Sequence, residues 1–236
     1  FKHYGNNWYH FFVLSRSGLY NKVEKYTGND RHNPKTIDYR SGESENKFRF
    51  EHHRYAANGF KLQVGAGIEY AHYDNTTARR LFAAGEAIDQ YYSRALNMWK
   101  WAVFGQVSRS FFSERLALSL GLRADGCNYT GKTAALYRQI SPRFSFSYAF
   151  DERWSLNGNI GRYYQLPAYT TLGFADAGGV LVNKRNKTGY IGADHYVLGV
   201  EYRPGTTTRI TLEGFYKTYD HYPVSLTDSV ALANKG

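Results

Sequence analysis

The stretch "GCNYTGKT" at residues 126–133 matches the G-x-x-x-x-G-K-[ST] pattern of a nucleotide-binding P-loop. In a P-loop, backbone N–H groups bind phosphates, the lysine reaches the β- and γ-phosphates, and the final hydroxyl holds Mg²⁺. This chemistry needs a continuously hydrophobic strand before the pattern and a helix of at least about 10 residues after it. Here the preceding segment alternates between apolar and small residues, and only "AALYRQI" separates Thr133 from Ser141. We therefore predict no nucleotide site.

The other residue types that could do chemistry lack the spacing that metal binding or catalysis needs. His52 and His53 are the only close histidine pair, and adjacent residues of a strand point to opposite faces. Ser141 is not part of a nucleophile elbow, and no spaced acid/base pair is present. We therefore predict no catalytic residue, metal site or resident cofactor. The polar residues near predicted outer strand ends are Asp125, Asp194, His195 and His221.

Cys127 and three glycosylation sequons add little to this picture. Cys127 is the single cysteine, so an intrachain disulfide is excluded. The N-x-[ST] sequons begin at Asn75, Asn128 and Asn186, all in predicted outer loops. They indicate exposed loops rather than glycosylation.

The composition favours strands and excludes helical membrane spans. Aromatic residues make up 17% of the chain, with 22 Tyr and 15 Phe, and the mean hydropathy is -0.57. No apolar run is long enough for a transmembrane helix, whereas the strands of a membrane β-barrel keep a low average hydropathy because lumen-facing residues are polar. The net charge of +10 is spread along the chain without a basic patch, which favours loops near an anionic membrane surface over nucleic-acid binding.

Apolar side chains alternate with small or charged ones along most of the chain. In 143–150, aromatic residues occupy every even position and Arg, Ser or Ala every odd one, and in 116–122 leucines alternate with Ala, Ser and Gly. A period of two predicts strands with two unlike faces. We expect about ten strands, mostly of a length that lets a tilted strand cross a bilayer. Similar alternation occurs at 46–55, 60–70, 99–107, 154–160, 196–202 and 210–216, and two weaker strands are expected at 8–16 and 19–27.

The expected connections alternate strictly between short and long. Outer-membrane barrels have short periplasmic turns and long extracellular loops, so this alternation assigns an orientation. Strands 59–73, 115–126, 153–164 and 207–221 are expected to run outward, with both chain ends on the outer side. The short turns are expected near Ser17-Gly18, 57–59, Phe112-Ser113, Asp151-Glu152 and Pro204-Gly205, and the long connections at roughly 26–43, 74–96, 127–138 and 165–189.

The parity of the strands assigns a lumen face and a lipid face. Charged residues that share parity with small polar ones should point into the lumen, and aromatic residues should form girdles on the lipid face. The expected lumen residues are Lys61, Glu69, Arg123, Arg143, Arg153, Glu201, Glu213 and Lys217. The girdle candidates are Trp99, Trp101, Trp154, Tyr148, Tyr202 and Tyr216.

The segment "ISPRFSFSYAFDERWSLNGNIGRYYQLPAY", followed by "YVLGVEY" and "LEGFYKTYDHYP", resembles the C-terminal half of the barrel of TonB-dependent outer-membrane receptors. The resemblance lies in a Pro-Arg strand, a tight turn, an outward strand with Gly-x-x-x-x-x-Pro, and a Phe-Tyr-Lys-x-Tyr strand. It is clearest over 97–236. The matching residues are Pro142, Arg143, Gly161, Pro167, Phe215, Tyr216, Lys217 and Tyr219.

The resemblance implies a barrel of about 22 strands, a plug domain inside it, and uptake of a scarce solute (siderophore, vitamin, glycan or peptide) powered by the TonB complex. We expect an all-β antiparallel transmembrane barrel in which 1–236 is a single incomplete domain with about ten strands, and in which the plug lies outside this chain. The implied location is the bacterial outer membrane, with long loops extracellular. Expected partners are outer-membrane lipid and lipopolysaccharide, TonB through the plug, the solute and a surface lipoprotein, but not nucleic acid.

The expected solute path combines lumen and loop residues. It comprises Glu69, Arg123, Arg143, Glu201 and Glu213 on the lumen face, and Tyr164, Gln165, Tyr169 and Phe174 at the last long loop.

Two other readings fit parts of the sequence. One is a self-contained ten-stranded outer-membrane enzyme, which would need catalytic residues converging at the outer rim. The other is a soluble all-β carbohydrate-binding or adhesion module, which would stay folded in buffer without detergent.

Overall fold

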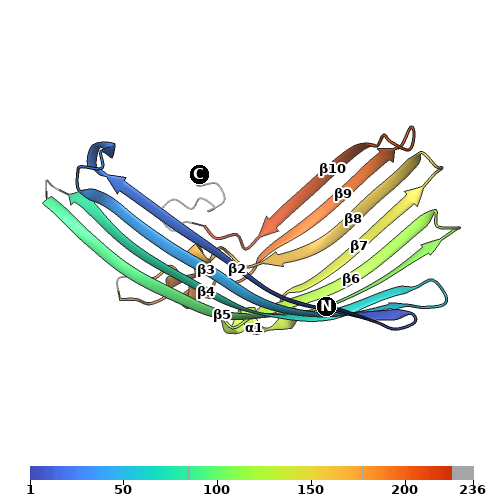
Figure 1. Ribbon diagram of the computed structural model, residues 1–236, viewed down its shortest axis with the longest axis horizontal. Coiled ribbons are helices and arrows are strands. Elements are labelled where there is room, and N and C mark those ends of the chain that lie inside the picture. The colour runs from blue at the N-terminus through green and yellow to red at the C-terminus, as the bar shows by residue number, and fades with distance from the viewer. Residues whose placement is uncertain (84–85, 177, 225–236) are drawn as a thin grey trace.

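The computed structural model describes residues 1–83, 86–176 and 178–224. Its strands form one antiparallel sheet in which every strand pairs with its sequence neighbours (Figure 1). This confirms the predicted all-β class. The strands are β1 (Lys2–Tyr4), β2 (Trp8–Tyr26), β3 (Lys35–Tyr55), β4 (Lys61–Ala83), β5 (Glu86–Phe111), β6 (Leu116–Cys127), β7 (Ile140–Ala149), β8 (Trp154–Gln165), β9 (Ile191–Tyr202) and β10 (Ile210–Asp220).

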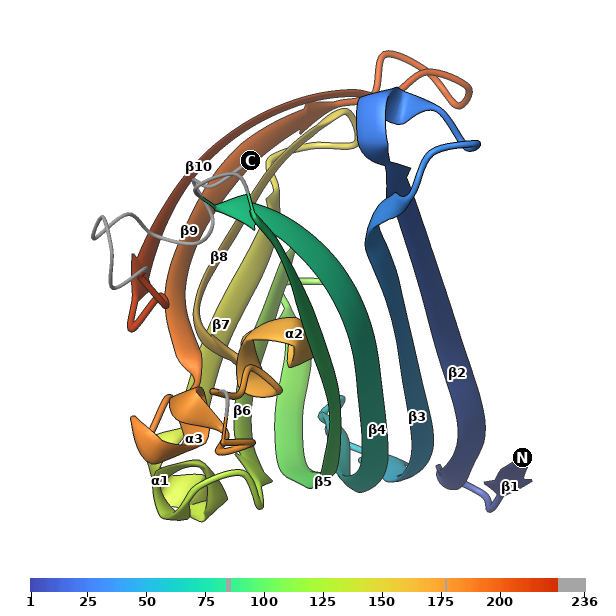
Figure 2. The same ribbon diagram turned by 90° about the vertical axis from the view of Figure 1, so that its left-hand side faces the viewer.

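The sheet curls into a trough that does not close on itself (Figure 2). Strands β1 and β10 are its two edges and are not paired with each other. We call the concave side of the trough the inner face and the convex side the outer face. Among the described residues, none of the helices has the length and apolar character to cross a membrane.

The outer face is apolar because the strand register aligns the alternating apolar residues of neighbouring strands. Leu120 and Leu212 of this face are 57% and 79% exposed, more than a water-facing sheet would normally leave uncovered. Near the short turns, Trp154 stacks on Tyr202 with ring centres 4.3 Å apart. One row of direct register partners runs across β6–β10 through Leu116, Tyr148, Leu156, Val200 and Leu212.

Strands β2–β5 are much longer than predicted. They contain 19, 21, 23 and 26 residues, against 10 to 12 in β6–β10. The expected loops at 26–43 and 74–96 are therefore mostly paired strand, although 84–85 lie outside the described residues. The alternation that reveals a half-buried strand is weak where polar and apolar residues share a face, and this explains the error.

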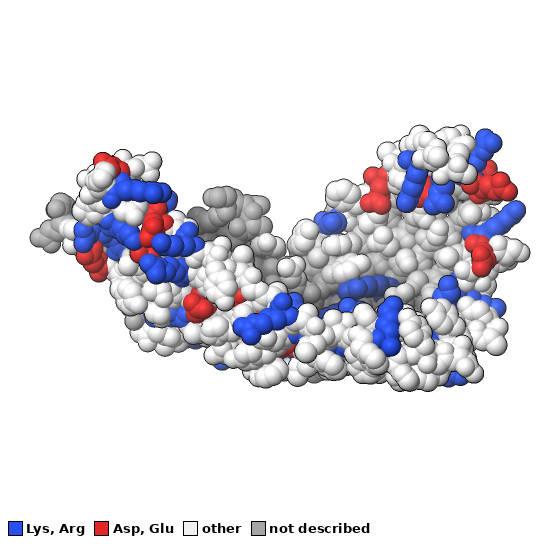
Figure 3. Space-filling model, viewed as in Figure 1, with Lys and Arg blue, Asp and Glu red and all other residues white. Residues whose placement is uncertain are grey.

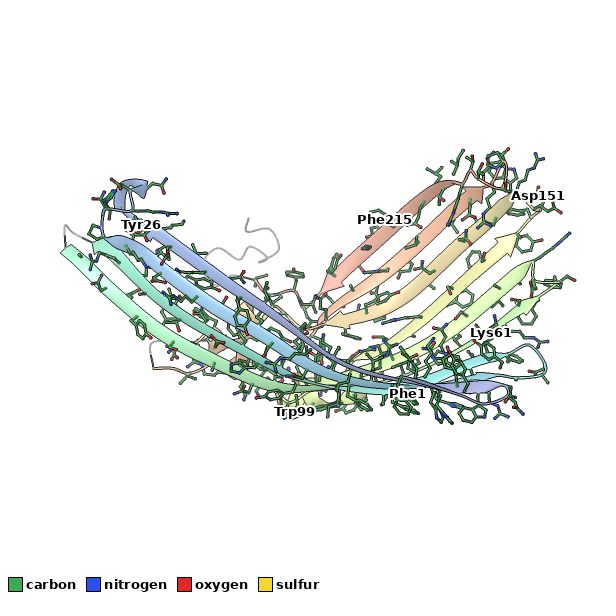
Figure 4. All side chains as sticks on the ribbon, in the orientation of Figure 1. Phe1, Tyr26, Lys61, Trp99, Asp151 and Phe215 are labelled. Atoms are coloured by element: carbon green, nitrogen blue, oxygen red, sulfur yellow. The ribbon has the colours of Figure 1, made fainter. Side chains whose placement is uncertain are left out.

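The predicted turn at Ser17-Gly18 is wrong, because both residues lie inside β2 and pair with β3. One strand therefore replaces the two expected at 8–16 and 19–27. As a result β2 begins at the end of the sheet that carries the short turns, where Figure 4 shows Lys61 and Asp151, and finishes at the opposite end with Tyr26. Both chain ends were expected at the end of the barrel that carries the long connections. This expectation is therefore wrong for the N-terminus. The other predicted short turns, at 57–59, 112–113, 151–152 and 204–205, do connect strands.

The two described long connections after β6 and β8 fold onto the inner face. They carry α1 (Gly131–Ala134), η2 (Leu136–Arg138), α2 (Tyr169–Leu172) and α3 (Val182–Arg185), while η1 (Thr27–Asn29) links β2 to β3. Tyr129 donates a hydrogen bond to the carbonyl of Leu172 at 2.7 Å, which joins the two connections. Burial, and to a lesser extent Cys127, raises the pKa of Tyr129 to about 12. The two connections pack against β4, β5 and β6 and form a small hydrophobic core with them. This core consists of Tyr73, Leu96, Met98, Cys127, Tyr129, Leu172 and Tyr190.

Candidate functional site

Along β4 the residues of the outer face change from apolar to charged, and this change indicates where an apolar environment would end. Ile68 and Tyr70 are apolar or aromatic, and Tyr70 packs on Trp99 with ring centres 5.0 Å apart. Four residues beyond Tyr70, the same face carries Asp74. Charged side chains gather over the far ends of β2–β5 and over the short turns (Figure 3). Aromatic residues followed by charges are typical of a membrane–water boundary.

At the level of this boundary, the inner face carries an ion-pair network across three strands. Lys47 Nζ lies 2.5 Å from Glu45 Oε2 and 3.2 Å from Glu69 Oε2. Lys100 Nζ lies 3.1 Å from Glu45 Oε1 and also pairs with Glu69. Two lysines and two glutamates therefore neutralise one another on β3, β4 and β5.

Tyr169 connects the long 166–190 loop to this network. Its hydroxyl accepts a hydrogen bond from Lys100 Nζ at 2.6 Å and donates one to Glu45. The Lys100 ammonium also lies 5.2 Å from the centre of the Tyr169 ring. Burial raises the pKa of Tyr169, and the hydrogen bond to Glu45 raises it further. The tyrosine is therefore neutral at physiological pH and fixes the loop to the wall of the trough.

A cavity of about 530 Å³ lies beside this attachment point on the inner face. Arg49 and Arg123 lie over the Phe104 ring, 5.0 and 5.9 Å from its centre. Arg123 also makes two hydrogen bonds to Asp125, at 2.8 and 2.6 Å. Charged side chains of both signs and aromatic rings thus surround a space that could hold a polar solute. Its lining includes five residues expected from the sequence, namely Glu69, Arg123, Tyr164, Gln165 and Tyr169.

The other four expected residues lie elsewhere. Arg143 lies over the Tyr163 ring, 4.4 Å from its centre, outside this cavity. Glu213 lies on β10 opposite Gly199. Glu201 is buried near the short turns, where Arg203 and Arg209 each approach one of its oxygens to 2.5 Å.

Phe174 lines a second cavity, of about 630 Å³, between the 166–190 loop and the extended β4–β5 hairpin. Arg94 borders it and donates to the carbonyl of Asp176 at 2.9 Å. Between the two cavities, the rings of Tyr73 and Tyr169 stack with centres 6.4 Å apart.

Several residues of the first cavity were missed from the sequence. Lys100 shares parity with the other inner residues of its strand, since it alternates with Trp99 and Trp101, and this signal could have identified it. Lys47 lies inside the alternating segment 46–55 and shares parity with Arg49, so the same signal could have identified it, whereas Glu45 lies just outside this segment.

The segment "GCNYTGKT" does not have the structure of a phosphate-binding loop. Strand β6 ends at Cys127, and α1 contains only four residues. Thr133 is buried and caps α1 with Thr130, and its hydroxyl donates to the carbonyls of Cys127 and Thr130. The sequence match therefore marks a compact turn.

The two adjacent histidines point to opposite faces, as the strand geometry predicts. His53 lies on the inner face, with Nε2 2.6 Å from Glu51 Oε2, while His52 packs against Trp8 on the outer face. Within the described part of the chain, no group of three or more His, Cys, Asp or Glu side chains is placed so that it could hold a metal ion.

The family described as TonB dependent receptor-like, beta-barrel matches residues 1–235. The chain belongs to this family. TonB-dependent receptors are outer-membrane transport proteins of Gram-negative bacteria, in agreement with the resemblance noted above. No curated protein sequence matches the chain.

Solved structures of TonB-dependent receptors share this fold. A mutant of the ferric enterobactin receptor PfeA from Pseudomonas aeruginosa is 15% identical over 92% of this chain and 33% of that chain, with a TM-score of 0.61. The copper transporter OprC is 13% identical over 90% and 39%, with a TM-score of 0.61. The ferric citrate transporter FecA, in its unliganded form, is 11% identical over 92% and 33%, with a TM-score of 0.58. The chain thus spans about a third of the length of these receptors.

Proposed function

We propose that this chain is the barrel portion of a TonB-dependent receptor that imports a scarce solute without covalent chemistry. The supporting observation is the cavity at the boundary level of the inner face, roofed by the 166–190 loop and lined by Arg49, Arg123 and Tyr164. A solute that enters from the side of the long connections would meet this cavity at the boundary level.

The lining favours a solute with several polar groups. Arginine guanidinium groups bind carboxylate, phosphate and phenolate oxygens, while aromatic rings contact flat or apolar parts of a ligand. Glu69 and Asp125 neutralise part of the positive charge, so a solute would compete with existing ion pairs. A siderophore, vitamin, glycan or peptide fits this description.

The proposed partners follow from the family. A plug domain outside this chain would occupy the trough and contact the TonB complex, and outer-membrane lipid and lipopolysaccharide would cover the apolar outer face. The solute would enter from the side of the long connections, which we propose to be extracellular. The extended β2–β5 wall at that side would also be the surface that a lipoprotein could contact.

Binding of candidate solutes to the full-length receptor tests the proposal. Calorimetry in detergent would use a panel of ferric siderophores, cobalamin, oligosaccharides and peptides. For the solute that binds, Arg123→Gln should weaken binding about tenfold or more, because a hydrogen bond to a charged group is worth about 1.5 to 3 kcal/mol. Arg143→Gln is the matched control, since Arg143 shares the inner face but does not line the cavity. Equal losses in both variants would contradict the assigned site.

A further inference from the structure

The second cavity lies beyond the boundary level, between the extended strands β3–β5 and the 166–190 loop. Its volume of about 630 Å³ is within the range of roughly 300–1,000 Å³ that is typical of small-molecule sites. Strand β3 contributes Tyr39, β4 contributes Asn75 and β5 contributes Tyr92, while Phe174 lines the cavity from the loop. The cavity is therefore assembled from segments that are far apart in the sequence.

The strand register places two tyrosines of this cavity on either side of a short side chain. Thr77 of β4 is the direct register partner of Tyr39 on β3 and of Tyr92 on β5. Directly opposed residues of antiparallel strands share a face, and neighbouring strands lie about 4.8 Å apart. The two tyrosines therefore leave the inner face about 10 Å apart. In the next row of the same face, Asn75 of β4 is the direct partner of Arg94 on β5.

The charged side chains in the described lining of this cavity, Asp89 and Arg94, are engaged by other groups of the protein. Arg80 binds the Asp89 carboxylate through two hydrogen bonds, each of 2.7 Å. Arg94 donates to the carbonyls of Ser93 and Asp176, at 2.7 and 2.9 Å. The neutral polar groups of the lining are those of Asn75, Gln90, Thr170, Tyr39, Tyr73, Tyr91 and Tyr92.

Neutral amides and hydroxyls beside aromatic rings match the chemistry of a sugar. A sugar ring carries hydroxyls that donate and accept hydrogen bonds, and its C–H groups pack on aromatic faces. An anionic group would instead need a cationic side chain that is free to bind it, and Arg94 is held by backbone carbonyls. We propose that the second cavity is a saccharide-binding subsite and that the imported solute carries a neutral sugar unit. This inference rests on the proposed function, because it names the chemical class of the solute.

An oligosaccharide array tests this inference on the full-length receptor in detergent. The probes are neutral and acidic oligosaccharides of defined linkage, and calorimetry gives the affinity of those that bind. We expect an oligosaccharide with neutral sugar units to bind. Tyr92→Ala and Phe174→Ala should each weaken its binding about tenfold or more, because aromatic anchors dominate the effects of truncation in binding sites. The two side chains are 41% and 59% exposed, so neither substitution removes a core residue.

Tyr20→Ala is the matched control. Tyr20 is an exposed tyrosine of the same wall, but it lies opposite Gly42 on the outer face. This variant should bind the oligosaccharide as tightly as the wild type. In the wild-type receptor, saturation-transfer NMR should show transfer from aromatic protons to the C–H protons of the sugar, so the test does not depend on the variants folding.

The inference is overturned if no oligosaccharide binds, if the sugar C–H protons receive no saturation, or if Tyr20→Ala weakens binding as much as Tyr92→Ala. These results are distinguishable from a failure of the proposed function. TonB-dependent uptake of a siderophore, cobalamin or peptide, without binding of any oligosaccharide, would support import and overturn the saccharide subsite. An oligosaccharide that binds in this cavity but is not taken up would support the subsite and contradict import.

Discussion

Substituting Leu120 by Arg measures whether the outer face contacts lipid. Leu120 lies on β6 between its register partners Val107 and Phe144 and is 57% exposed. Strand β6 has 12 residues, and at about 3.3 Å per residue and a tilt near 45° it rises about 28 Å, close to the roughly 25 Å apolar band of an outer-membrane barrel. Leu120 is four residues from Leu116, where β6 begins, so it lies about 9 Å inside that band.

Arg costs about 2–4 kcal/mol at the bilayer midplane and about 0–1 kcal/mol at the interfaces. For Leu120→Arg at this depth we expect a loss of about 2 kcal/mol in the free energy of unfolding. The control is Ser119→Arg, one residue earlier on the inner face, where its partners Ser108 and Ser145 are small. That substitution should cost less than about 1 kcal/mol.

The assay is guanidinium unfolding of the full-length receptor in phospholipid vesicles, followed by tryptophan fluorescence. The midpoints and slopes of the two variants give the difference in unfolding free energy. If Ser119→Arg costs as much as Leu120→Arg, the assignment of the inner and outer faces is refuted.

Three further substitutions test particular contacts. Tyr169→Phe removes the hydroxyl that joins Lys100 and Glu45, so it should increase amide hydrogen exchange in the 166–190 loop at a cost of about 1 kcal/mol, and unchanged exchange would contradict the attachment. Gly192→Ala would place a methyl group against the Arg162 guanidinium, which pairs with Asp194 and Asp220, so this substitution should lower the unfolding temperature. In the control Gly189→Ala the added methyl group meets nothing within 4 Å, so the unfolding temperature should not change. Equal effects of the two substitutions would contradict a close approach of Gly192 to Arg162. In the 151–153 turn, backbone N–H groups of Arg153 and Trp154 lower the pKa of Asp151, so its stabilisation is present above pH of about 4 and is lost as the pH falls through the lowered pKa. Asp151→Asn should therefore flatten the pH dependence of the unfolding temperature below about pH 4, and an unchanged profile would exclude the turn as its source.

The sequence predicted the part of the fold in which one face is apolar and the other polar. In β6 and β7 every second side chain is apolar, and register partners such as Leu118 and Phe146 indeed meet on one face. Beyond Tyr70 and before Trp99 neither face is uniformly apolar: polar residues such as Asn75 and Thr77 share the inner face with Tyr73, Leu96 and Met98. The period of two is therefore weak and the sequence resembles a loop. Pairing over this stretch depends on the partner strand, which local sequence does not encode.

The candidate site was only partly predictable for a related reason. Parity placed Glu69 and Arg123 on the inner face, and the structure brings both to one cavity. Parity assigns a residue to a face but does not give its height on the sheet relative to residues of other strands. Glu201 was therefore predicted on the same solute path as Glu69 and Arg123, although it lies near the short turns. The position of Tyr169 over Lys100 depends on the fold of a long loop, which carries no periodic signal.

Solute accumulation in living cells tests the central claim most directly. The complete receptor would be expressed in cells with and without a functional TonB complex, and uptake of the solute found by calorimetry would be measured. Uptake should require TonB, fall strongly with Arg123→Gln and remain near wild type with Arg143→Gln. Uptake that persists without TonB, or that is equal in the two variants, would contradict import through this cavity.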